Sequence, residues 1–363
     1  MLILGLETSC DETAASVIKA NQKITVLSSI VSSQISLHAE WGGVVPNLAA
    51  REHLKHILPV IEASLTEASI EASDLDLIAI TNGPGLIPAL LIGTNAAKTL
   101  SYVWQKPLLG IHHIEGHIYA NFIDQIRSQK SKVKNATIKF PVLCLVVSGG
   151  HTQLVLMKDH LQYEIVGQTL DDAAGEAFDK VARILGLGYP GGPAVAAAAK
   201  KYQPKITATK MQTKLPRPML NSKNFDFSFS GLKTAVLYTV RKNPKILQEK
   251  RSVSALCREF QQAVVDVLVA KTLRAAEKYN PKTIMLAGGV SANDELRSQL
   301  GLAIKKELPK TGYCLPNAGY SIDNAVMIAA AGFFRWQKMT GTQRRTALVE
   351  WNKLATDANL KLK

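Results

Sequence analysis

The sequence predicts an α/β fold built from two lobes. Short apolar runs typical of buried strands alternate with longer segments of helical periodicity, which is the pattern of α/β architectures. Several of the strand-like runs end in tight glycine-containing turns. At 363 residues the chain exceeds the usual size of a single hydrophobic core, so two lobes are expected.

The N-terminal part is expected to form a sheet and its covering helices. Residues 2–6 are apolar, no basic segment precedes them and Glu7 follows, which indicates a first strand rather than a signal peptide. Further apolar runs predict its hairpin neighbours, and helical periodicity appears twice after them. We expect strands at 2–6, 14–18, 24–30 and 77–81, and helices at 54–68 and 89–104.

The second half of the chain repeats this alternation. We expect strands at 142–147 and 284–287, and helices at 178–185, 253–279 and 325–336. We assign residues 1–110 and 325–345 to lobe I and residues 111–324 to lobe II. Residues 346–363 are expected to form a C-terminal tail.

Composition excludes several classes of protein. Hydrophobic residues make up 47% of the chain, and no apolar run is long enough to span a bilayer. The cysteines at positions 10, 144, 257 and 314 are scattered singly, so neither a disulfide framework nor a thiolate zinc site is indicated. We therefore expect a cytoplasmic protein without membrane contact.

The net charge of +14 favours a polyanionic partner, above all nucleic acid. The basic insert, residues 200–251, holds thirteen Lys and Arg residues against two acids, and the basic run 127–139 holds no acid. Phe225, Phe227 and Phe229 lie in the insert, where their alternate spacing equally fits a strand that buries one face. The alternative interpretation of the charge is a solvated surface.

A histidine pair carries the most specific chemical information. His113 and His117 lie four residues apart, so a helix places both imidazoles on one face. Apolar residues recur at the same spacing on the neighbouring face and give this helix a side to bury. Neutral imidazoles bind zinc, iron, copper or nickel, and a third ligand from elsewhere would complete the site.

Glycine turns follow several predicted strands. Val147-Ser-Gly-Gly and Ala287-Gly-Gly-Val each come directly after a strand, and backbone amides freed at such turns can hold phosphate. No turn matches a Walker A loop or the dinucleotide fingerprint. Together the two turns indicate a nucleotide cleft between two similar lobes.

A series of ordered motifs extends from residue 2 to about residue 336. They are Gly5-Leu-Glu-Thr-Ser-Cys-Asp-Glu-Thr13, Trp41-Gly-Gly-Val-Val-Pro46, Gly83-Pro-Gly-Leu86, the histidine segment 98–118, Val147-Ser-Gly-Gly-His-Thr-Gln153, Asp171-Asp-Ala-Ala-Gly-Glu-Ala-Phe-Asp-Lys180, Tyr189-Pro-Gly-Gly-Pro193, Phe227-Ser-Phe-Ser-Gly-Leu-Lys-Thr234, Ala287-Gly-Gly-Val-Ser-Ala-Asn293 and Asp323-Asn-Ala-Val-Met-Ile328. Together they resemble the tRNA N6-adenosine threonylcarbamoyltransferase family of the bacterial TsaD type, formerly described as glycoproteases. The chain departs from the family pattern at Trp41, Asn47 and Ile322, none of which is a candidate ligand.

The resemblance implies a fold and a reaction. The fold is actin-like (ASKHA), with duplicated ribonuclease-H-like lobes and a cleft between them. The reaction moves the threonylcarbamoyl group from threonylcarbamoyl-AMP to N6 of adenosine 37, in tRNAs that read codons beginning with A. The enzyme would bind the anticodon stem-loop and work with a smaller paralogous subunit of the TsaB type and an ATPase subunit of the TsaE type.

The resemblance also implies site residues at the matching positions. His113, His117 and Asp323 correspond to the ligands of one divalent metal per subunit, with iron(II) first and zinc(II) as the alternative. The substrate-binding positions are Val146, Val147, Ser148, Gly149, Gly150, Asp179, Gly192 and Asn293. Asp11 and Glu12 are the candidates for the base that removes a proton from the adenine amine.

Three other functions fit parts of the sequence. A metallopeptidase requires His-Glu-x-x-His, but Glu115 is two residues from each histidine and points to a different helix face. An actin-like ATPase or sugar kinase fits the glycine turns, but those enzymes use magnesium with oxygen ligands. A nucleic-acid-binding scaffold fits the charge, and it would keep its function without Asp323.

Overall fold

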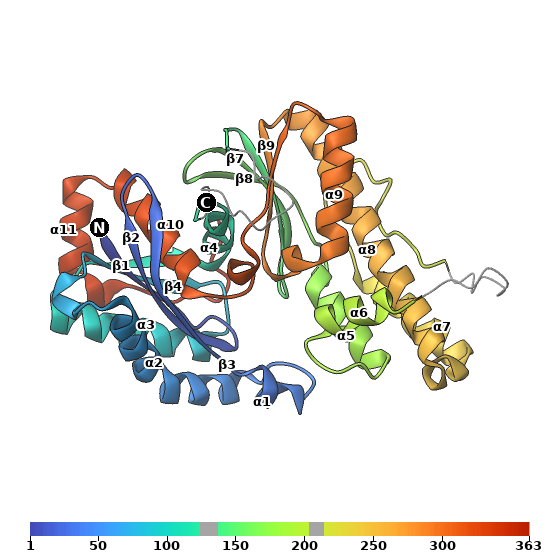
Figure 1. The fold of residues 1–363 in the computed structure, drawn as a ribbon, viewed down its shortest axis with the longest axis horizontal. Helices are drawn as coiled ribbons and strands as arrows, with labels where there is room; N and C mark the ends of the chain where they lie inside the picture. Colours follow the sequence, from blue (N-terminus) through green and yellow to red (C-terminus); the bar gives the residue numbers. More distant parts are fainter. Residues whose placement is uncertain (124–136, 203–213, 363) are drawn as a thin grey trace. The chain divides into compact units, whose positions relative to one another are not determined.

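Two mixed five-stranded sheets, each with its own helices, organise the protein (Figure 1). The computed structural model describes residues 1–123, 137–202 and 214–362. Unit 1 comprises Met1–Thr137, Asp159–Tyr163 and Pro316–Lys363, and unit 2 comprises Ile138–Lys158 and Glu164–Leu315. The α/β class predicted from the alternating sequence pattern is confirmed.

The sheet of unit 1 has the strand order β3-β2-β1-β4-β5. Its strands are β1 (Leu2–Glu7), β2 (Glu12–Ala20), β3 (Ile24–Ser33), β4 (Leu77–Gly83) and β5 (Leu108–His112). The first three form antiparallel hairpins, whereas β4 and β5 continue the sheet parallel to β1. The carboxyl ends of β1, β4 and β5 therefore meet at one edge of the sheet, which is where open α/β sheets bind ligands.

Helices cover both faces of this sheet. Helices α2 (Pro46–Ala68) and α3 (Ile87–Trp104) pack on the face to which Leu4 and Leu6 point. Helix α10 (Ala325–Lys338) packs on the opposite face, so closely that a Cβ at Gly5 would lie 2.3 Å from the Ala325 carbonyl oxygen. The other helices of unit 1 are α1 (Ile35–Ala39), α4 (His113–Tyr119) and α11 (Gly341–Val349).

Unit 2 repeats the topology of unit 1. Its strand order is β10-β9-β6-β7-β8, where β6 and β7 are antiparallel and β9 and β10 continue parallel to β6. The strands are β6 (Val142–Val147), β7 (Thr152–Asp159), β8 (Gln162–Gln168), β9 (Thr283–Ala287) and β10 (Gly312–Cys314). In both sheets the order is third, second, first, fourth, fifth, which confirms the predicted duplication.

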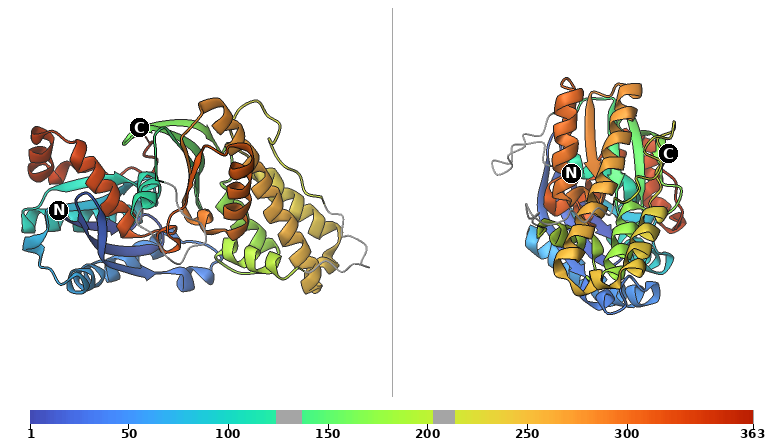
Figure 2. Two further views of the ribbon diagram at one scale, coloured as in Figure 1. Left: turned by 45° about the horizontal axis from the view of Figure 1, so that its top comes forward. Right: turned by 90° about the vertical axis from the view of Figure 1, so that its right-hand side faces the viewer.

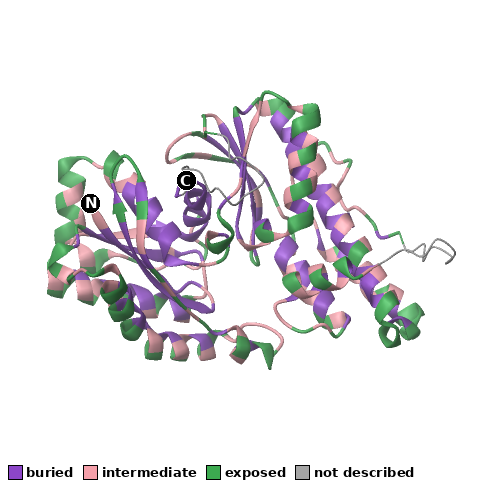
Figure 3. Cartoon of the chain, viewed as in Figure 1, coloured by how far each residue is buried: buried purple, intermediate pink, exposed green. Residues whose placement is uncertain are grey.

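Five longer helices build the core of unit 2. They are α5 (Ala174–Ile184), α6 (Gly191–Lys200), α7 (Ser230–Lys242), α8 (Lys250–Tyr279) and α9 (Asp294–Glu307). Figures 1 and 2 show α8 and α9 on the same side of the sheet. The central strands β1, β4, β6 and β9 are largely buried, whereas the edge strands β3 and β8 are mostly accessible (Figure 3). In the core, the rings of Phe178 and Phe260 meet edge to face at 5.1 Å.

Unit 1 includes four stretches that are predicted to lie outside lobe I: residues 111–137, 159–163, 316–324 and 346–363. Helix α4 belongs to unit 1, where it packs against α10, whereas residues 111–324 are predicted to form lobe II. Residues 346–362 also pack within unit 1, and Trp351 and Leu354 contact its core. Most of the basic run 127–139, and residues 203–213 of the basic insert, lie outside the described residues. No helix in the described part combines the length and apolar character needed to cross a membrane.

Candidate functional site

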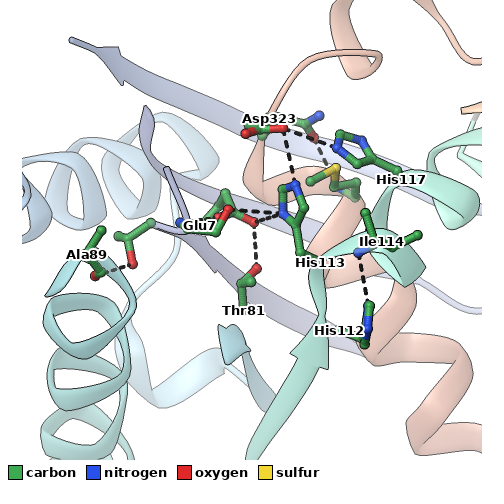
Figure 4. A network of polar contacts seen from close by, with 12 residues as sticks. Glu7, Thr81, Ala89, His112, His113, Ile114, His117 and Asp323 are labelled. Carbon is green, nitrogen blue, oxygen red and sulfur yellow. Dashed lines mark hydrogen bonds and ion pairs between the residues drawn. The ribbon is translucent and has the colours of Figure 1, made fainter. Parts of the chain in front are cut away.

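The edge of the sheet in unit 1 brings the three candidate metal ligands together. Strand β5 ends at His112 and leads directly into α4, so His113 and His117 lie one turn apart on the same helix face. Asp323 comes from the loop before α10. Its Oδ1 lies 3.5 Å from Nε2 of His113 and 3.2 Å from Nε2 of His117 (Figure 4).

These three groups fit a divalent transition metal. Their ligand atoms all lie within 4.8 Å of one another, and both imidazoles are buried. Among the described residues, neither ring nitrogen of His117 has a hydrogen bond of good geometry. Leaving a buried polar group in that state costs about 1–3 kcal/mol, and a metal bound at Nε2 would remove part of the cost. Imidazole and carboxylate donors suit iron or zinc.

Glu7, a buried carboxylate that is not among the predicted site residues, holds His113. Nδ1 of His113 lies 3.1 Å from Oε2 of Glu7 and 3.1 Å from the hydroxyl of Ser9. Glu7 also accepts hydrogen bonds from the Thr81 hydroxyl and from the Ser9 backbone N–H, both at 2.5 Å. A proton on Nδ1 that is donated to Glu7 leaves Nε2 free to bind a metal. The available signal in the sequence is a charged residue at the end of an apolar strand.

The charges around His113 set its protonation in the absence of a cation. Burial lowers the pKa of His113, but the negative charges of Asp323 and Glu7 outweigh burial and raise the pKa to about 9. Burial lowers the pKa of His117. Burial raises the pKa of Glu7, but the charge and hydrogen bond of His113 reverse this, and the pKa lies below its ordinary value. A divalent cation must therefore displace a proton from His113.

The two candidate bases are buried: Asp11 directly precedes β2, and Glu12 is the first residue of β2. Burial, followed by the negative charges of Asp323 and Asp11, raises the pKa of Glu12 to about 10. A carboxyl group that holds its proton at neutral pH cannot accept another from an amine. In the absence of a cation, Asp11 is therefore the better candidate of the two.

Glu115 faces away from the candidate ligands, as its spacing predicts. Its carboxylate is fully buried and accepts two hydrogen bonds from Arg335 of α10, at 2.5 and 2.7 Å. A carboxylate engaged in this bidentate pair is not free to activate water, which is the role that a metallopeptidase would require of it.

In unit 2, the candidate phosphate-binding residues form the turn between β6 and β7. The Ser148 hydroxyl accepts the backbone N–H of His151 at 3.1 Å, and Ser148 N–H donates to the His151 carbonyl at 2.8 Å. Gly149 and Gly150 are exposed, and a Cβ on either would meet nothing within 4 Å. Gly175 of α5 backs the turn, since a Cβ there would lie 2.5 Å from the Ser148 carbonyl oxygen. The turn therefore presents free backbone on one side only.

The two glycine turns singled out in the sequence are neighbours within unit 2. They follow β6 and β9, which are adjacent parallel strands. Gly288 has a φ of +84°, and a Cβ there would lie 2.5 Å from the Val147 carbonyl oxygen, so only glycine fits. The parallel pairing of β6 and β9 joins the two turns at one edge of the sheet of unit 2.

The remaining candidate nucleotide contacts lie around α5, α6 and α9. Asp179 of α5 accepts the backbone N–H of Gly191 at 2.7 Å, which brings its carboxylate to the first turn of α6, where Gly192 lies. Asn293 caps α9 by accepting the N–H of Leu296 at 3.0 Å, and its amide donates to Gln261. Val146 and Val147 are fully buried, so only their backbone is available to a ligand.

The basic insert buries two of its three phenylalanines, and Phe225 is partly buried. Phe227 and Phe229 are fully buried, and the segment forms only an isolated bridge between Phe227 and Thr169, not a strand, among the described residues. The exposed charges gather where α7 leads through a short helix, η3 (Pro244–Gln248), into α8. This basic tip comprises Arg241, Lys242, Lys245, Lys250 and Arg251.

Comparison with known proteins gives one consistent family. The family model described as TsaD, tRNA N6-adenosine threonylcarbamoyltransferase, matches residues 25–330. The protein of that name from Listeria monocytogenes is 50% identical over 331 residues, which cover 91% of this chain and 90% of the relative. The one from Bacillus subtilis is 48% identical over 345 residues, which cover 93% and 91%.

A solved structure shares the fold. That of HypF from T. kodakarensis superposes on 93% of this chain and 48% of its own, with a TM-score of 0.55 at 13% sequence identity. Full-length HypF in a phosphate- and nucleotide-bound form gives a TM-score of 0.53 at 12% identity, over 93% of this chain and 47% of that one. At such identities the likeness concerns the fold alone.

Proposed function

This chain belongs to the TsaD family of tRNA N6-adenosine threonylcarbamoyltransferases, and we propose that its metal centre and its glycine turns serve that reaction. It is a transferase that modifies tRNA. We infer that it moves the threonylcarbamoyl group from threonylcarbamoyl-AMP to N6 of adenosine 37, in tRNAs that read codons beginning with A. The convergence of His113, His117 and Asp323 carries the proposal.

We assign one divalent ion per subunit to these three ligands, iron(II) in the first place and zinc(II) as the alternative. When bound, the ion supplies Lewis-acid stabilisation of the charge that develops as the donor anhydride breaks. The two histidines contribute Nε2, and Glu7 holds the ring of His113 in place. The Asp323 side chain is 23% exposed, more than either imidazole, so substrate has access from its side.

The nucleotide part of the donor is assigned to unit 2. The amides of Gly149 and Gly150 and the hydroxyl of Ser148 would hold the phosphate, and the space around both glycines supports this role. The carboxylate of Asp179 would bind the ribose, with Gly192 beside it. Backbone groups of Val146 and Val147 and the amide of Asn293 would complete the contacts.

The acceptor is a weak nucleophile, because the lone pair of the adenine amine is delocalised into the ring. The enzyme must position this amine and remove its proton as the bond to the carbamoyl carbon forms and AMP leaves. We assign the proton to Asp11. Exposed basic residues of the insert would bind the phosphates of the anticodon stem-loop.

The family resemblance supplies the remaining parts of the proposal. We expect a smaller paralogous subunit of the TsaB type and an ATPase subunit of the TsaE type as partners. We also place the enzyme in the cytoplasm, together with its tRNA substrate. Its four cysteines are free thiols, which agrees with a reducing compartment.

The test is a transfer assay with Asp323→Ala. The protein is incubated with threonylcarbamoyl-AMP, tRNA and both partner proteins, and the tRNA nucleosides are analysed by mass spectrometry. We expect Asp323→Ala to lose transfer but to keep tRNA binding, while Glu62→Ala, at an exposed position of α2, keeps both. Transfer by Asp323→Ala would refute the metal assignment. Peptide hydrolysis abolished by His113→Ala would favour a metallopeptidase.

A further inference from the structure

The C-terminal segment, residues 351–362, packs against the edge of the sheet that carries the candidate metal ligands. We propose that this segment is a functional part of the metal centre, because it fixes the ring of His112, the residue that caps α4. The inference rests on the metal centre proposed above. The segment lies beyond residues 25–330, the part of the chain that the family model matches.

Four hydrogen bonds attach the segment to Asn82 of β4, to the loop after β4 and to His112. They are Asn82 Nδ2 to the Ala355 carbonyl (3.0 Å), Asp357 N–H to the Asn82 carbonyl (2.9 Å), Gly85 N–H to the Ala358 carbonyl (3.3 Å) and His112 Nε2 to the Leu360 carbonyl (3.0 Å). Since they use backbone groups all along the segment, they define its register on the sheet edge.

Close packing holds the segment in the same place. A Cβ at Gly83 would lie 2.0 Å from the Asp357 carbonyl oxygen, and one at Gly110 would lie 2.6 Å from Cδ1 of Leu354. Two glycines thus leave the space that the segment fills. At its start, the ring of Trp351 lies 5.2 Å from that of Tyr102. These contacts identify the segment as a docked element of unit 1.

His112 connects this element to the metal ligands. The carbonyl oxygen of Leu360 can only accept a hydrogen bond, so Nε2 of His112 must carry the proton. In a neutral imidazole Nδ1 is then an acceptor, and it accepts the backbone N–H of Ile114 at 3.1 Å (Figure 4). This bond is the N-cap of α4, whose first residue is His113. The Leu360 carbonyl therefore selects the tautomer that caps the helix.

The cap has a large effect here because α4 is only seven residues long. A short helix makes few internal hydrogen bonds, so its end depends on the side chain that satisfies its first N–H groups. Both imidazoles project from this helix, and a shift at its start moves Nε2 of His113 relative to Asp323. Groups hydrogen-bonded directly to a metal ligand typically change metal affinity by about 10–100-fold, and we expect the lower end of this range for a group that acts through the helix start.

The experiment measures metal affinity and not turnover. Chelator-treated full-length protein and a protein truncated after Glu350 are titrated with Zn²⁺ in competition with a chromophoric chelator, and circular dichroism reports the fold. We expect the truncated protein to bind one ion about tenfold more weakly than the full chain. Equal affinity of the two proteins would overturn the proposal.

Point variants keep the test valid if truncation also disturbs folding. His112→Phe removes the cap in the full chain, and we expect the same loss of about tenfold. His112→Asn restores a good capping side chain that does not need Leu360, so affinity stays close to wild type. Lys353→Ala, at an exposed position of the segment, is the matched control and leaves affinity unchanged.

The combination of variants isolates the role of His112. If the segment acts through His112, truncation lowers affinity in the wild-type background but has little effect in the H112N background. An equal loss in both backgrounds, or wild-type affinity in His112→Phe, would overturn the proposal. Full-length protein that binds no Zn²⁺ would defeat the metal centre as well, whereas unchanged affinity in the variants would defeat only this inference.

Discussion

Glu7 illustrates at the scale of one residue how a buried side chain controls a metal ligand. It accepts hydrogen bonds from His113, Thr81 and Ser9 and is fully buried. Glu7→Gln keeps the shape but removes the charge and one acceptor oxygen. We expect Zn²⁺ affinity to fall by about 10–100-fold, measured by chelator competition. Glu62→Gln, on the exposed side of α2, should leave it unchanged. Unchanged affinity in Glu7→Gln would show that the charge of Glu7 does not control this ligand.

The raised pKa of His113 predicts proton release on metal binding. With a pKa of about 9, this imidazole is protonated at pH 7 and must lose its proton to become a ligand. The lowered pKa of His117 means that this second ligand releases none. We therefore expect about one proton per Zn²⁺ at pH 7, measured by calorimetry in buffers of different ionisation enthalpy.

The same linkage gives the pH dependence of affinity. As pH rises from 7 to 9, apparent affinity should increase about tenfold per unit, since one proton is displaced, and it should level off above pH 9. Affinity that stays constant over this range would mean that His113 is neutral in the metal-free protein.

Sequence spacing identifies site residues only when they lie close together in the chain. His113 and His117 are one helical turn apart, so their pairing follows from the sequence. Asp323 comes from the family resemblance alone. Neither sequence spacing nor the family resemblance identifies Glu7. Its contact with His113 joins positions 106 residues apart and depends on the parallel arrangement of the strands.

At the scale of elements, a buried ion pair connects α4 to α10. Glu115 is fully buried and Arg335 partly exposed. Arg335→Met leaves the carboxylate without its partner, and we expect the free energy of unfolding to fall by about 2–3 kcal/mol in urea titrations. Lys338 lies on the same helix as Arg335 and forms an exposed pair with Asp159 of β7. Lys338→Ala breaks this pair and should lower the free energy of unfolding by less than about 1 kcal/mol. Similar losses in both variants would contradict this assignment.

A substitution in the glycine turn of unit 2 can separate an effect on AMP binding from an effect on stability. A Cβ at Gly149 meets no atom within 4 Å, so Gly149→Ala should leave stability within about 0.5 kcal/mol of wild type. If phosphate lies against this backbone, the same methyl group weakens AMP binding by about tenfold or more, measured by calorimetry. Gly341→Ala, also in open space but at the start of α11, should affect neither property. Full AMP affinity in Gly149→Ala would remove the turn from the nucleotide site.

Helices and strands with a strong apolar period are predictable from the sequence. Elements that depend on a side-chain cap or on backbone hydrogen bonds to another segment are not. Strand β6 has the predicted bounds, and α8 begins within three residues of its predicted start. Helix α6 begins with Gly191-Gly192-Pro193, which favours a turn, and the cap from Asp179 stabilises its start. The segment 351–362 docks mainly through backbone hydrogen bonds, which leave no periodic pattern in the sequence.

At the scale of the whole molecule, the same strand order carries candidate metal ligands in unit 1 and candidate phosphate-binding turns in unit 2. Each unit places one group of its candidate residues at the carboxyl ends of its parallel strands. Unit 1 gathers histidines and carboxylates there, whereas unit 2 gathers glycine turns. The duplicated strand order explains why similar turns recur along the chain, but only the pairing of β6 with β9 decides which turns are neighbours.

The net charge of +14 predicts tRNA binding that weakens steeply with salt, and the basic tip predicts where the charge acts. Neutralising Arg241, Lys242 and Lys245 with glutamine removes three exposed charges next to the start of α8. We expect weaker binding and a slope of log K against log salt that falls by about 2–3, measured by fluorescence anisotropy.

A matched variant separates a local surface from overall charge. Lys305, Lys306 and Lys310 are equally exposed at the end of α9, and glutamine at all three positions removes the same charge. If the tip contacts phosphates, only its variant changes the slope markedly, because counterions are released only where protein and RNA meet. Zn²⁺ affinity should be unaffected in both proteins. Equal loss of tRNA binding in the two variants would mean that the general basicity of the protein, and not the tip, holds the RNA.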